Sequence, residues 1–359
     1  MQVKPGPEGR DPQRPLLGFT LGDTNGIGPE VVLKTLADPR LLNLCVPVVY
    51  GNGRLVRRYR KAMADQGEDL PWHFISSLEQ VNPKKINLLS AWEDDWEVQL
   101  GKPTAESGQA AYLSLAKAVA DAKAGTLQAL VTAPIAKSNM PEAFAATGHT
   151  DYLARELGGG KSLMVMATEF MRVALLTDHI PLKDVPRALT PQRLKERLQL
   201  FADSLRKDFG ALHPKIAVLG LNPHAGEDGT LGREEIDVLG PALQELKGQM
   251  PTLLGPFAAD AFFGRHQYRR FDGVLALYHD QGLIPFKALA ADEGVNFTAG
   301  LPLVRTSPAH GTAFDIAGKQ RAEAGSTRAA AWMALDALRR RRQAPVPAPK
   351  LEKMPKPLP

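Results

Sequence analysis

Short apolar runs alternate with amphipathic segments along most of the chain. Runs of the length typical of buried strands occupy residues 16–19, 44–50, 127–132, 215–221 and 273–278. Between them, residues 107–123 carry apolar side chains at helical spacing. Another helix is predicted after Thr190 and Pro191, a typical N-cap and first-turn pair, and ends at Gly210. Strands that alternate with helices predict an α/β fold with a largely parallel sheet.

The length and the charge distribution refine this picture. A chain of 359 residues with 44% hydrophobic content suits two packed lobes or one large α/β domain. The net charge is +5, but residues 339–359 alone hold seven basic residues and one acidic residue. The Pro-rich segment 343–359 is predicted to be a disordered basic tail, and residues 1–14 a flexible arm. The near-neutral body does not indicate a nucleic-acid partner.

Several protein classes are disfavoured by what the sequence lacks. No apolar stretch reaches the roughly 20 residues that a membrane helix needs. The first residues lack the apolar core of a signal peptide. Cys45 is the single cysteine, so an internal disulfide and a cysteine-based zinc cage are excluded. We therefore expect a cytoplasmic enzyme without a membrane or nucleic-acid partner.

Three histidines each follow an apolar run that reads as a strand. His179 lies in VALLTDHIPL, His224 in IAVLGLNPHAGE and His279 in GVLALYHDQG. Ligands of open parallel sheets bind at the carboxyl ends of the strands, and imidazole is the commonest neutral metal ligand. Each histidine alone is also compatible with a loop or capping role, but together they predict a divalent-metal site. The polar neighbours expected to orient these rings are Asp178, Asn222, Glu227, Asp280 and Gln281.

A fourth histidine begins an amphipathic segment. His149 precedes Thr150 and Asp151 in TGHTDYLARELG, where Thr150 or Asp151 would cap a helix. A helix N-terminus also favours an anion, so a phosphate or carboxylate near His149 and Thr150 is one interpretation. Simple helix capping is the other, and the residues alone leave both open.

Further polar residues follow the His279 segment. Lys287 would pair with an anionic substrate or serve as a base, and Arg305 would clamp a carboxylate or phosphate through two N–H groups. Asn296 lies between them in the chain. The loop HGTAFDIAG offers backbone N–H groups and Asp315 as a ribose or adenine partner, unless it is an ordinary turn. TAPIAK, at 132–137, follows a strand and fits the wall of the same site.

As an ordered set, these motifs resemble the 4-hydroxythreonine-4-phosphate dehydrogenase (PdxA) family. The resemblance runs from about residue 16 to 339 and rests on GDTNGIGPE, TAPIAK, GHTDYLA, LLTDHIPL, LNPHAGE, ALYHDQGLIPFK, VNFTAGLPLVRTS and HGTAFDIAG. It implies a two-domain fold like isocitrate and isopropylmalate dehydrogenases, with the active site in the interdomain cleft. Residues 15–140 with 312–342 would form the first domain and 141–311 the second. It also implies a homodimer with active sites at the subunit interface.

The resemblance assigns roles to individual residues. The implied metal ligands, for zinc, cobalt or magnesium, are His179, His224 and His279. The implied substrate-binding residues are His149, Thr150, Lys287, Asn296 and Arg305. Lys287 and Asp260 are the implied catalytic residues. The residues expected to bind NAD or NADP are Gly26, His310, Gly311, Thr312 and Asp315.

The implied reaction oxidises the C3 hydroxyl of 4-phosphooxy-L-threonine, and the product loses CO₂ to give 3-amino-2-oxopropyl phosphate, a precursor of pyridoxal phosphate. One alternative is a relative that acts on D-threonate or D-erythronate 4-phosphate or on a dihydrodiol carboxylate. Another is a non-catalytic protein that keeps the fold and holds nucleic acid through its basic tail. The three histidines argue against the latter.

The stretch GDTNGIGPE looks at first like a dinucleotide-binding fingerprint. Its glycine order is G-x-x-x-G-x-G, and Glu30 occupies the first turn of the following helix, where it disfavours a pyrophosphate. Thr24 and Asn25 also depart from the family's common Gly-Asp-Pro-Ala-Gly form, and Gln320 replaces a frequent glycine. We expect a turn that lines the cleft near the nicotinamide end of the cofactor.

Overall fold

A computed structural model of the protein describes residues 14–63, 70–158 and 160–343. Within these residues, twelve strands form one sheet in the order β3-β4-β2-β1-β5-β12-β11-β6-β7-β10-β8-β9. The strands are β1 (Leu16–Thr20), β2 (Val46–Gly51), β3 (Trp72–Ile75), β4 (Ile86–Ser90), β5 (Ala129–Thr132), β6 (Leu163–Ala167), β7 (Arg172–Leu175), β8 (Ile216–Leu219), β9 (Leu253–Phe257), β10 (Gly273–Ala276), β11 (Val295–Ala299) and β12 (Val304–Pro308).

Helices cover both faces of this sheet. They are α1 (Gly28–Leu36), α2 (Pro39–Leu44), α3 (Gly53–Met63), α4 (Ala105–Lys123), α5 (His149–Glu156), α6 (Val185–Ala188), α7 (Pro191–Lys207), α8 (Gly240–Leu246), α9 (Ala259–Gly264), α10 (His279–Ala290) and α11 (Gly325–Arg342). Among the helices of the described segments, none combines the length and the apolar character required to cross a membrane.

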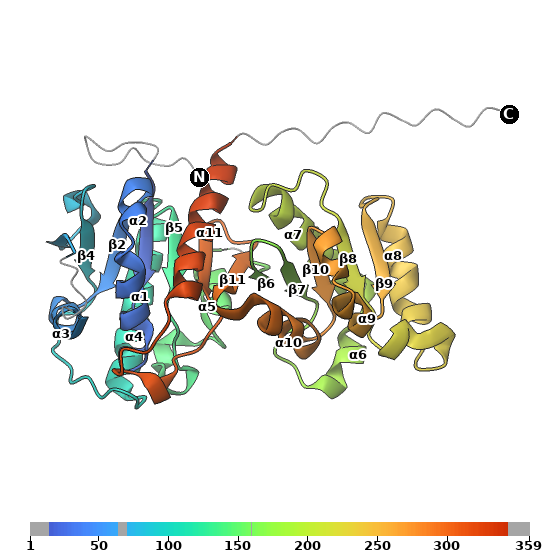
Figure 1. Ribbon diagram of the computed structural model, residues 1–359, viewed down its shortest axis with the longest axis horizontal. Coiled ribbons are helices and arrows are strands. Elements are labelled where there is room, and N and C mark those ends of the chain that lie inside the picture. The colour runs from blue at the N-terminus through green and yellow to red at the C-terminus, as the bar shows by residue number, and fades with distance from the viewer. Residues whose placement is uncertain (1–13, 64–69, 159, 344–359) are drawn as a thin grey trace.

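The sheet is parallel at both ends and antiparallel only in the middle. β11 runs antiparallel to β12 and β6, and β6 runs antiparallel to β7, whereas the other neighbouring pairs are parallel. Figure 1 shows the resulting elongated molecule, with the first strands at one end, β8 and β9 at the other, and α11 near the centre. The predicted α/β fold with a mostly parallel sheet is therefore confirmed.

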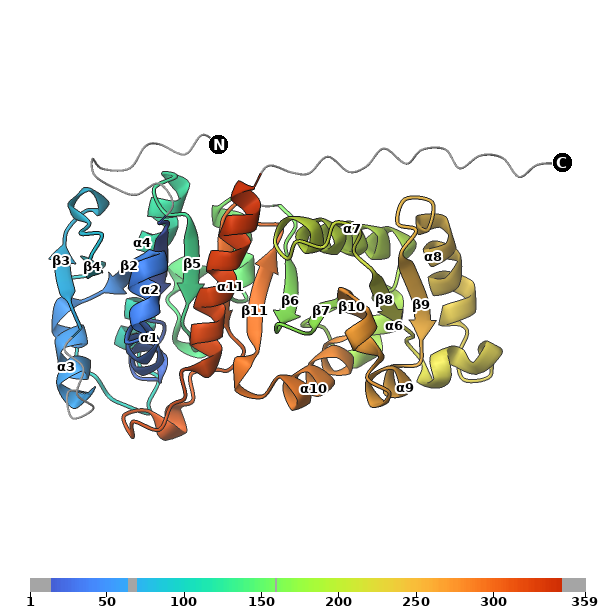
Figure 2. The same cartoon turned by 45° about the horizontal axis from the view of Figure 1, so that its top comes forward.

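Three apolar clusters define the layers. One large cluster joins α1, α2, α11, α7 and α8 to one face along the length of the sheet. The other face carries two separate clusters, one under α4 and α5 and one under α9 and α10. The turned view in Figure 2 places α7 and α10 on opposite sides of the sheet. The second face is thus left without an apolar cover over its central strands.

Most predicted elements lie within a few residues of their observed bounds. The helix predicted at 107–123 begins at Ala105, and Thr190 caps α7 by accepting a hydrogen bond from Arg193 N–H. The division into domains at residues 140 and 312 stays a prediction. In the structure, Leu153 and Leu303, which fall in the predicted second domain, pack in the cluster under α4 and α5.

The Gly-rich stretch after β1 is a buried joint within the protein. Gly22 has a φ of +64°, and a Cβ atom there would lie 2.2 Å from the carbonyl oxygen of Pro134. Asp23 N–H donates to that same carbonyl, and Ile27 N–H donates to the Thr312 carbonyl. Glycine is needed at position 22 because the backbone of this stretch packs directly against the backbone of Pro134. The stretch thereby fixes the loops after β5 and β12, which reach the site described below.

The ends of the described chain are anchored by arginines. Arg14, the last residue of the predicted arm, donates to the carbonyls of Leu42, Cys45 and Pro83. Arg341 forms an ion pair of 2.6 Å with the buried Asp208. The cationic run at the end of α11 therefore belongs to the folded body rather than to a solvated tail. The rest of the predicted arm and tail, at 1–13 and 344–359, lies outside the described residues.

Candidate active site

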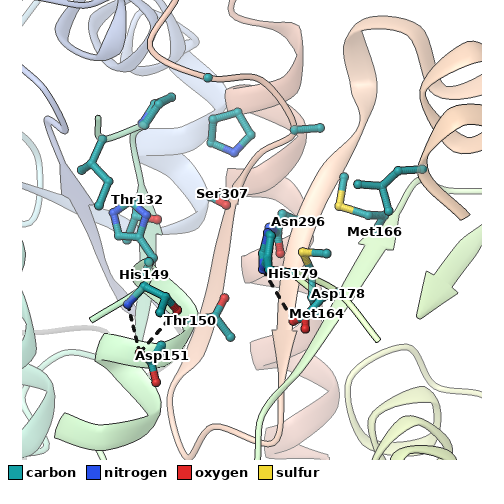
Figure 3. Close-up of a pocket in the computed structure, with 18 of the residues that line it drawn as sticks. Thr132, His149, Thr150, Asp151, Met164, Met166, Asp178, His179, Asn296 and Ser307 are labelled. Atoms are coloured by element: carbon teal, nitrogen blue, oxygen red, sulfur yellow. Dashed lines mark hydrogen bonds and ion pairs between the residues drawn. The ribbon is translucent and has the colours of Figure 1, made fainter. Parts of the chain in front are cut away.

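A cavity of about 600 Å³ lies over the central strands, between α5 and α10. Side chains alternate across a sheet, so every second residue of these strands points into it. Asn296 of β11 lies opposite Ser307 of β12 and Met166 of β6 in the register, and all three line the cavity. Figure 3 shows Thr132, His149 and Thr150 on one side, facing Asn296, His179 and Asp178 on the other.

Arg305 is a buried cation on the floor of this cavity. Its side chain is 2% exposed, and it forms no ion pair with any residue of the described segments. Nε and Nη2 donate to Thr132 Oγ1 at 3.1 and 2.6 Å, and Nη1 donates to Thr298 Oγ1 at 3.0 Å. Burial lowers the pKa of Arg305 to about 9, which still leaves the guanidinium charged at neutral pH. Two of its five N–H groups remain for an anion.

His149 occupies the first turn of α5 at the rim of the cavity. The N-cap is Gly148, so the expectation that Thr150 or Asp151 caps this helix is wrong. Asp151 instead lies in the first turn, and its Oδ2 accepts a hydrogen bond from Thr147 N–H. The N–H groups of a first helical turn lack intrahelical partners and carry partial positive charge. The helix start therefore adds to the positive potential around Arg305.

Three residues that line the cavity each hold a buried polar atom without a partner in the described part of the chain. These atoms are His149 Nε2, Asn296 Oδ1 and His310 Nε2. A buried polar atom without a hydrogen bond costs about 1–3 kcal/mol. Because the three converge on one cavity with an unpaired guanidinium, the arrangement fits a polar, anionic ligand.

The lowered pKa of His149 predicts how the free energy of unfolding depends on pH in mild acid. Burial, reinforced by the charges of Arg305 and Lys137, holds the pKa of His149 well below its ordinary value of 6.5. Below pH 6.5 the unfolded chain binds a proton that the folded chain does not, so the free energy of unfolding falls as the pH falls. We expect His149→Asn to lose stability less steeply than the wild type as the pH drops below about 6.5. Urea unfolding across a pH series measures this.

The matched control for that experiment is His213→Asn, at an exposed histidine before β8. It is expected to keep the wild-type slope of stability against pH. Equal slopes for His149→Asn and the wild type would contradict a neutral, buried His149.

Two of the three predicted metal ligands lie side by side. β7 and β10 are parallel neighbours, so the segments that follow them leave the sheet together. The ring centroids of His179 and His279 are 5.9 Å apart. His279 Nδ1 lies 2.7 Å from Asp280 Oδ1, and His179 Nδ1 lies 3.9 Å from Asp178 Oδ2. Both histidines line the cavity, and Figure 3 shows His179 on the side opposite His149.

His224 follows the next strand, β8, but is not part of this pair. Within the described segments, no group of three or more His, Cys, Asp or Glu side chains is arranged to hold a metal ion. His224 instead begins a run of five residues with positive φ, from His224 to Asp228. A left-handed conformation costs roughly 1–2 kcal/mol per non-glycine residue. Such a conformation persists only when its surroundings enforce it.

The residues predicted to orient the histidine rings also fall into two groups, those beside a ring and those that bind elsewhere. Gln281 forms its hydrogen bonds with backbone groups instead of a histidine ring. It accepts a hydrogen bond from Leu277 N–H and donates to the Gly220 carbonyl, which ties the ends of β10 and β8 together. Asn222 donates to Glu234 and Glu235 rather than to a ring. Of the five predicted residues, all of which lie within the described segments, Asp178 and Asp280 are the two that pair with a histidine of the predicted set.

The other predicted site residues fall into two groups. Those that line the cavity are His149, Thr150, Lys287, Asn296, Arg305, His310 and Gly311. Those outside its lining are Gly26, Thr312, Asp315 and Asp260. Asp260 is exposed in the first turn of α9. A Cβ atom on Gly26 would lie 2.7 Å from the Thr312 carbonyl oxygen, so these two residues meet each other behind the cavity.

Sequence reasoning missed several lining residues. Ser307, Met164 and Met166 are strand residues, and Arg197 reaches the cavity from α7. The polar residues at alternate positions of VNFTA, and the polar run that includes Arg305 and Ser307 in VRTSP, signal the polar floor. No local pattern marks the two methionines or Arg197.

The class of protein follows from the fold and from solved structures that share it. A 4-hydroxythreonine-4-phosphate dehydrogenase from Klebsiella pneumoniae is 33% identical with a TM-score of 0.79, over 92% of this chain and 99% of that one. A terephthalate 1,2-cis-dihydrodiol dehydrogenase from Burkholderia xenovorans is 26% identical with a TM-score of 0.60, over 90% and 98%. By its likeness to the former, this protein is a dehydrogenase, a class that in general uses a nicotinamide cofactor.

The particular family is equally clear. Residues 43–334 match the family model described as pyridoxal phosphate biosynthetic protein PdxA. The 4-hydroxythreonine-4-phosphate dehydrogenase of Bacteroides thetaiotaomicron is 44% identical over 329 residues, which cover 91% of this chain and 90% of that protein. The enzyme of that name from Synechocystis is 41% identical, over 91% and 97%. The chain belongs to the PdxA family.

Proposed function

We propose that this protein oxidises 4-phosphooxy-L-threonine at its C3 hydroxyl with NAD or NADP and releases CO₂ to give 3-amino-2-oxopropyl phosphate for pyridoxal phosphate synthesis. The similarity to enzymes with that name supports the substrate. The observation that carries the proposal is Arg305, a buried guanidinium with two free N–H groups at the floor of the cavity.

The cavity suits a substrate with anionic groups. Arg305, His149 and Thr150 would bind one anionic group, assisted by the first turn of α5. Asn296 would accept a hydrogen bond from the substrate at its buried, unpaired Oδ1. Lys287 of α10 adds a second cation on the side of the histidine pair. These contacts would hold the C3 hydroxyl near His179 and His279.

A divalent metal ion fits the chemistry of these donors. Two imidazoles, each beside a carboxylate, suit zinc or cobalt better than magnesium. Zinc and cobalt bind nitrogen donors well, whereas magnesium prefers oxygen donors. His179 and His279 would hold it together with a His224 ring. When bound, the ion would supply Lewis-acid polarisation of the substrate hydroxyl and carbonyl. Lys287 and Asp260 would move the protons of the reaction, and Lys287 is the one of these two that lines the cavity.

The cofactor would lie beyond the rim formed by His310 and Gly311. His310 Nε2 is buried and unpaired, which makes it available to a ligand. Thr312 and Gly26 would support this rim from behind, because Ile27 N–H donates to the Thr312 carbonyl. Asp315, exposed just beyond them, would receive the ribose or adenine. A cytoplasmic location stays a prediction.

Steady-state kinetics with purified protein test the proposed function. We expect 4-phosphooxy-L-threonine to reduce NAD or NADP and to release CO₂. D-threonate 4-phosphate, D-erythronate 4-phosphate and a dihydrodiol carboxylate serve as competing substrates. Turnover of one of these without turnover of 4-phosphooxy-L-threonine would overturn the proposal and leave the fold assignment untouched.

A second copy of the chain would complete the metal site, because His224 does not join His179 and His279 within one chain. This proposal predicts activity in mixed dimers of two inactive variants, His224→Ala and Arg305→Ala. If each site takes His224 from one subunit and Arg305 from the other, a hybrid dimer contains one intact site and one doubly damaged site. Activity that appears after the subunits are exchanged measures this.

The control for the mixed dimers is each variant exchanged with itself, which should remain inactive. If both residues serve a site from the same subunit, the mixture stays as inactive as the controls. Light scattering of the wild type should give the mass of a dimer.

A further inference from the structure

His224 is presented by an uncommon backbone. The five residues from His224 to Asp228 have φ values of 52°, 53°, 86°, 42° and 53°, and only one of them is glycine. The side chain of His224 is exposed on this turn, beyond the end of β8. An L-residue does not adopt this conformation without support from its surroundings. A neighbouring group must therefore stabilise the left-handed turn.

Glu235 is the group that holds the base of the turn. It is 5% exposed and lies at the start of the helical segment Glu235–Leu239. Its Oε1 accepts from the backbone N–H groups of Leu221 at 2.6 Å and Asn222 at 2.8 Å. Its Oε2 accepts from Asn222 Nδ2 at 2.9 Å. The carboxylate therefore binds Leu221 and Asn222, two of the four residues that connect β8 to the turn.

The same carboxylate also packs against the turn itself. A Cβ atom on Gly226 would lie 2.7 Å from Glu235 Oε2, and one on Gly220 would lie 3.1 Å from Oε1. Glu235 forms no ion pair with a residue of the described segments, so N–H donors alone satisfy its charge. A buried carboxylate held by N–H donors makes strong, directional hydrogen bonds. Its position between the strand end and the turn fixes the direction in which His224 leaves the sheet.

We propose that Glu235 is the positioning residue for His224: its carboxylate locks the left-handed turn and so aims the imidazole as a metal ligand. This inference rests on the proposed function, in which His224 completes the metal site. Glu235 lies outside the cavity lining and acts through the backbone N–H groups of Leu221 and Asn222 and through the Asn222 side chain.

Glu235→Gln is the main test, because the amide keeps the shape but loses the charge and places an NH₂ group among N–H donors. We expect the apoprotein to bind Co²⁺ about 10- to 100-fold more weakly, the typical cost of losing an outer contact to a ligand. The visible absorption of bound Co²⁺ should change, which reports ligand geometry directly. Hydrogen exchange of the peptide at 220–232 should accelerate while the central strands keep wild-type protection.

Asp237→Asn is the matched control, since it removes one carboxylate from the same segment. Asp237 is exposed, and its carboxylate pairs with Arg233. It should keep wild-type Co²⁺ affinity and absorption. If Glu235→Gln does not fold, Asn222→Ala replaces it as the test. That variant removes only the side-chain bonds to Glu234 and Glu235, and a smaller loss of affinity in the same direction is expected.

His224→Ala separates failure of this inference from failure of the proposed function. If His224→Ala loses Co²⁺ affinity but Glu235→Gln keeps wild-type affinity and absorption, the role of Glu235 is overturned and the metal site stands. If His224→Ala itself binds Co²⁺ like the wild type, His224 is not a ligand, and the proposed metal site falls together with the inference.

Discussion

Arg305→Lys is expected to lower kcat/KM for the phosphorylated substrate by about 100-fold or more, chiefly through KM. Hydrogen bonds to charged groups contribute about 1.5–3 kcal/mol each, and 1.36 kcal/mol corresponds to tenfold in rate. Lysine keeps the charge but cannot donate two parallel N–H bonds to an anion while also binding Thr132 and Thr298. Steady-state kinetics with the phosphorylated substrate, beside thermal unfolding of the variant, measure the effect.

The control for this prediction is Arg172→Lys, which changes a half-buried arginine of β7 outside the cavity lining. Arg172 donates to the Glu169 carbonyl and lies over the ring of Phe209. Its replacement should leave KM close to that of the wild type. A folded Arg305→Lys enzyme with wild-type KM would show that the buried guanidinium supports the sheet and does not bind substrate.

His179→Ala is expected to remove the metal and with it nearly all activity. An ion that polarises the reacting oxygen contributes several kcal/mol to the transition state, so kcat should fall by about 1000-fold or more. The metal content after dialysis, measured by elemental analysis, should drop to background. Chelation of the wild type should have the same effect, and added Zn²⁺ or Co²⁺ should restore activity to the wild type alone.

The matched control is His213→Ala, which removes an exposed histidine outside the cavity. It should keep both metal and activity. Retention of metal and wild-type kcat by His179→Ala would remove the metal from the proposed mechanism, whatever the substrate.

The location of the cavity was only partly predictable. The sequence placed His179 and His279 after apolar runs, and the parallel pairing of β7 with β10 brings them together at one edge. The spacing does not reveal that β11 and β12 insert between the two parallel halves of the sheet. That insertion puts Asn296 and Arg305 on the cavity floor. Pairing between strands distant in the chain is set by tertiary contacts.

The packing of the Gly-rich stretch could not be predicted from the sequence, for a different reason. Its glycine order argues against a phosphate cradle, and in the structure the stretch packs against Pro134 and Thr312. Its place beside the cofactor stays a prediction. A glycine that admits a ligand and one that admits a carbonyl oxygen look the same in the sequence. The predicted capping of α5 failed for a related reason, since any of Gly148, Thr150 and Asp151 suits a helix start.

The sequence by itself determined the α/β class, the family and the residue types available for metal and anion binding, because apolar periodicity and ordered motifs are local properties of the chain. The tertiary structure alone decided that Arg305 is buried without a carboxylate, that His224 stands apart from the other two histidines, and that Glu235 supports its turn. Burial, hydrogen bonding and separation in space depend on residues far apart in the chain, such as Thr132 and Arg305, which are in contact although 173 positions separate them. No local pattern of residues encodes those distances.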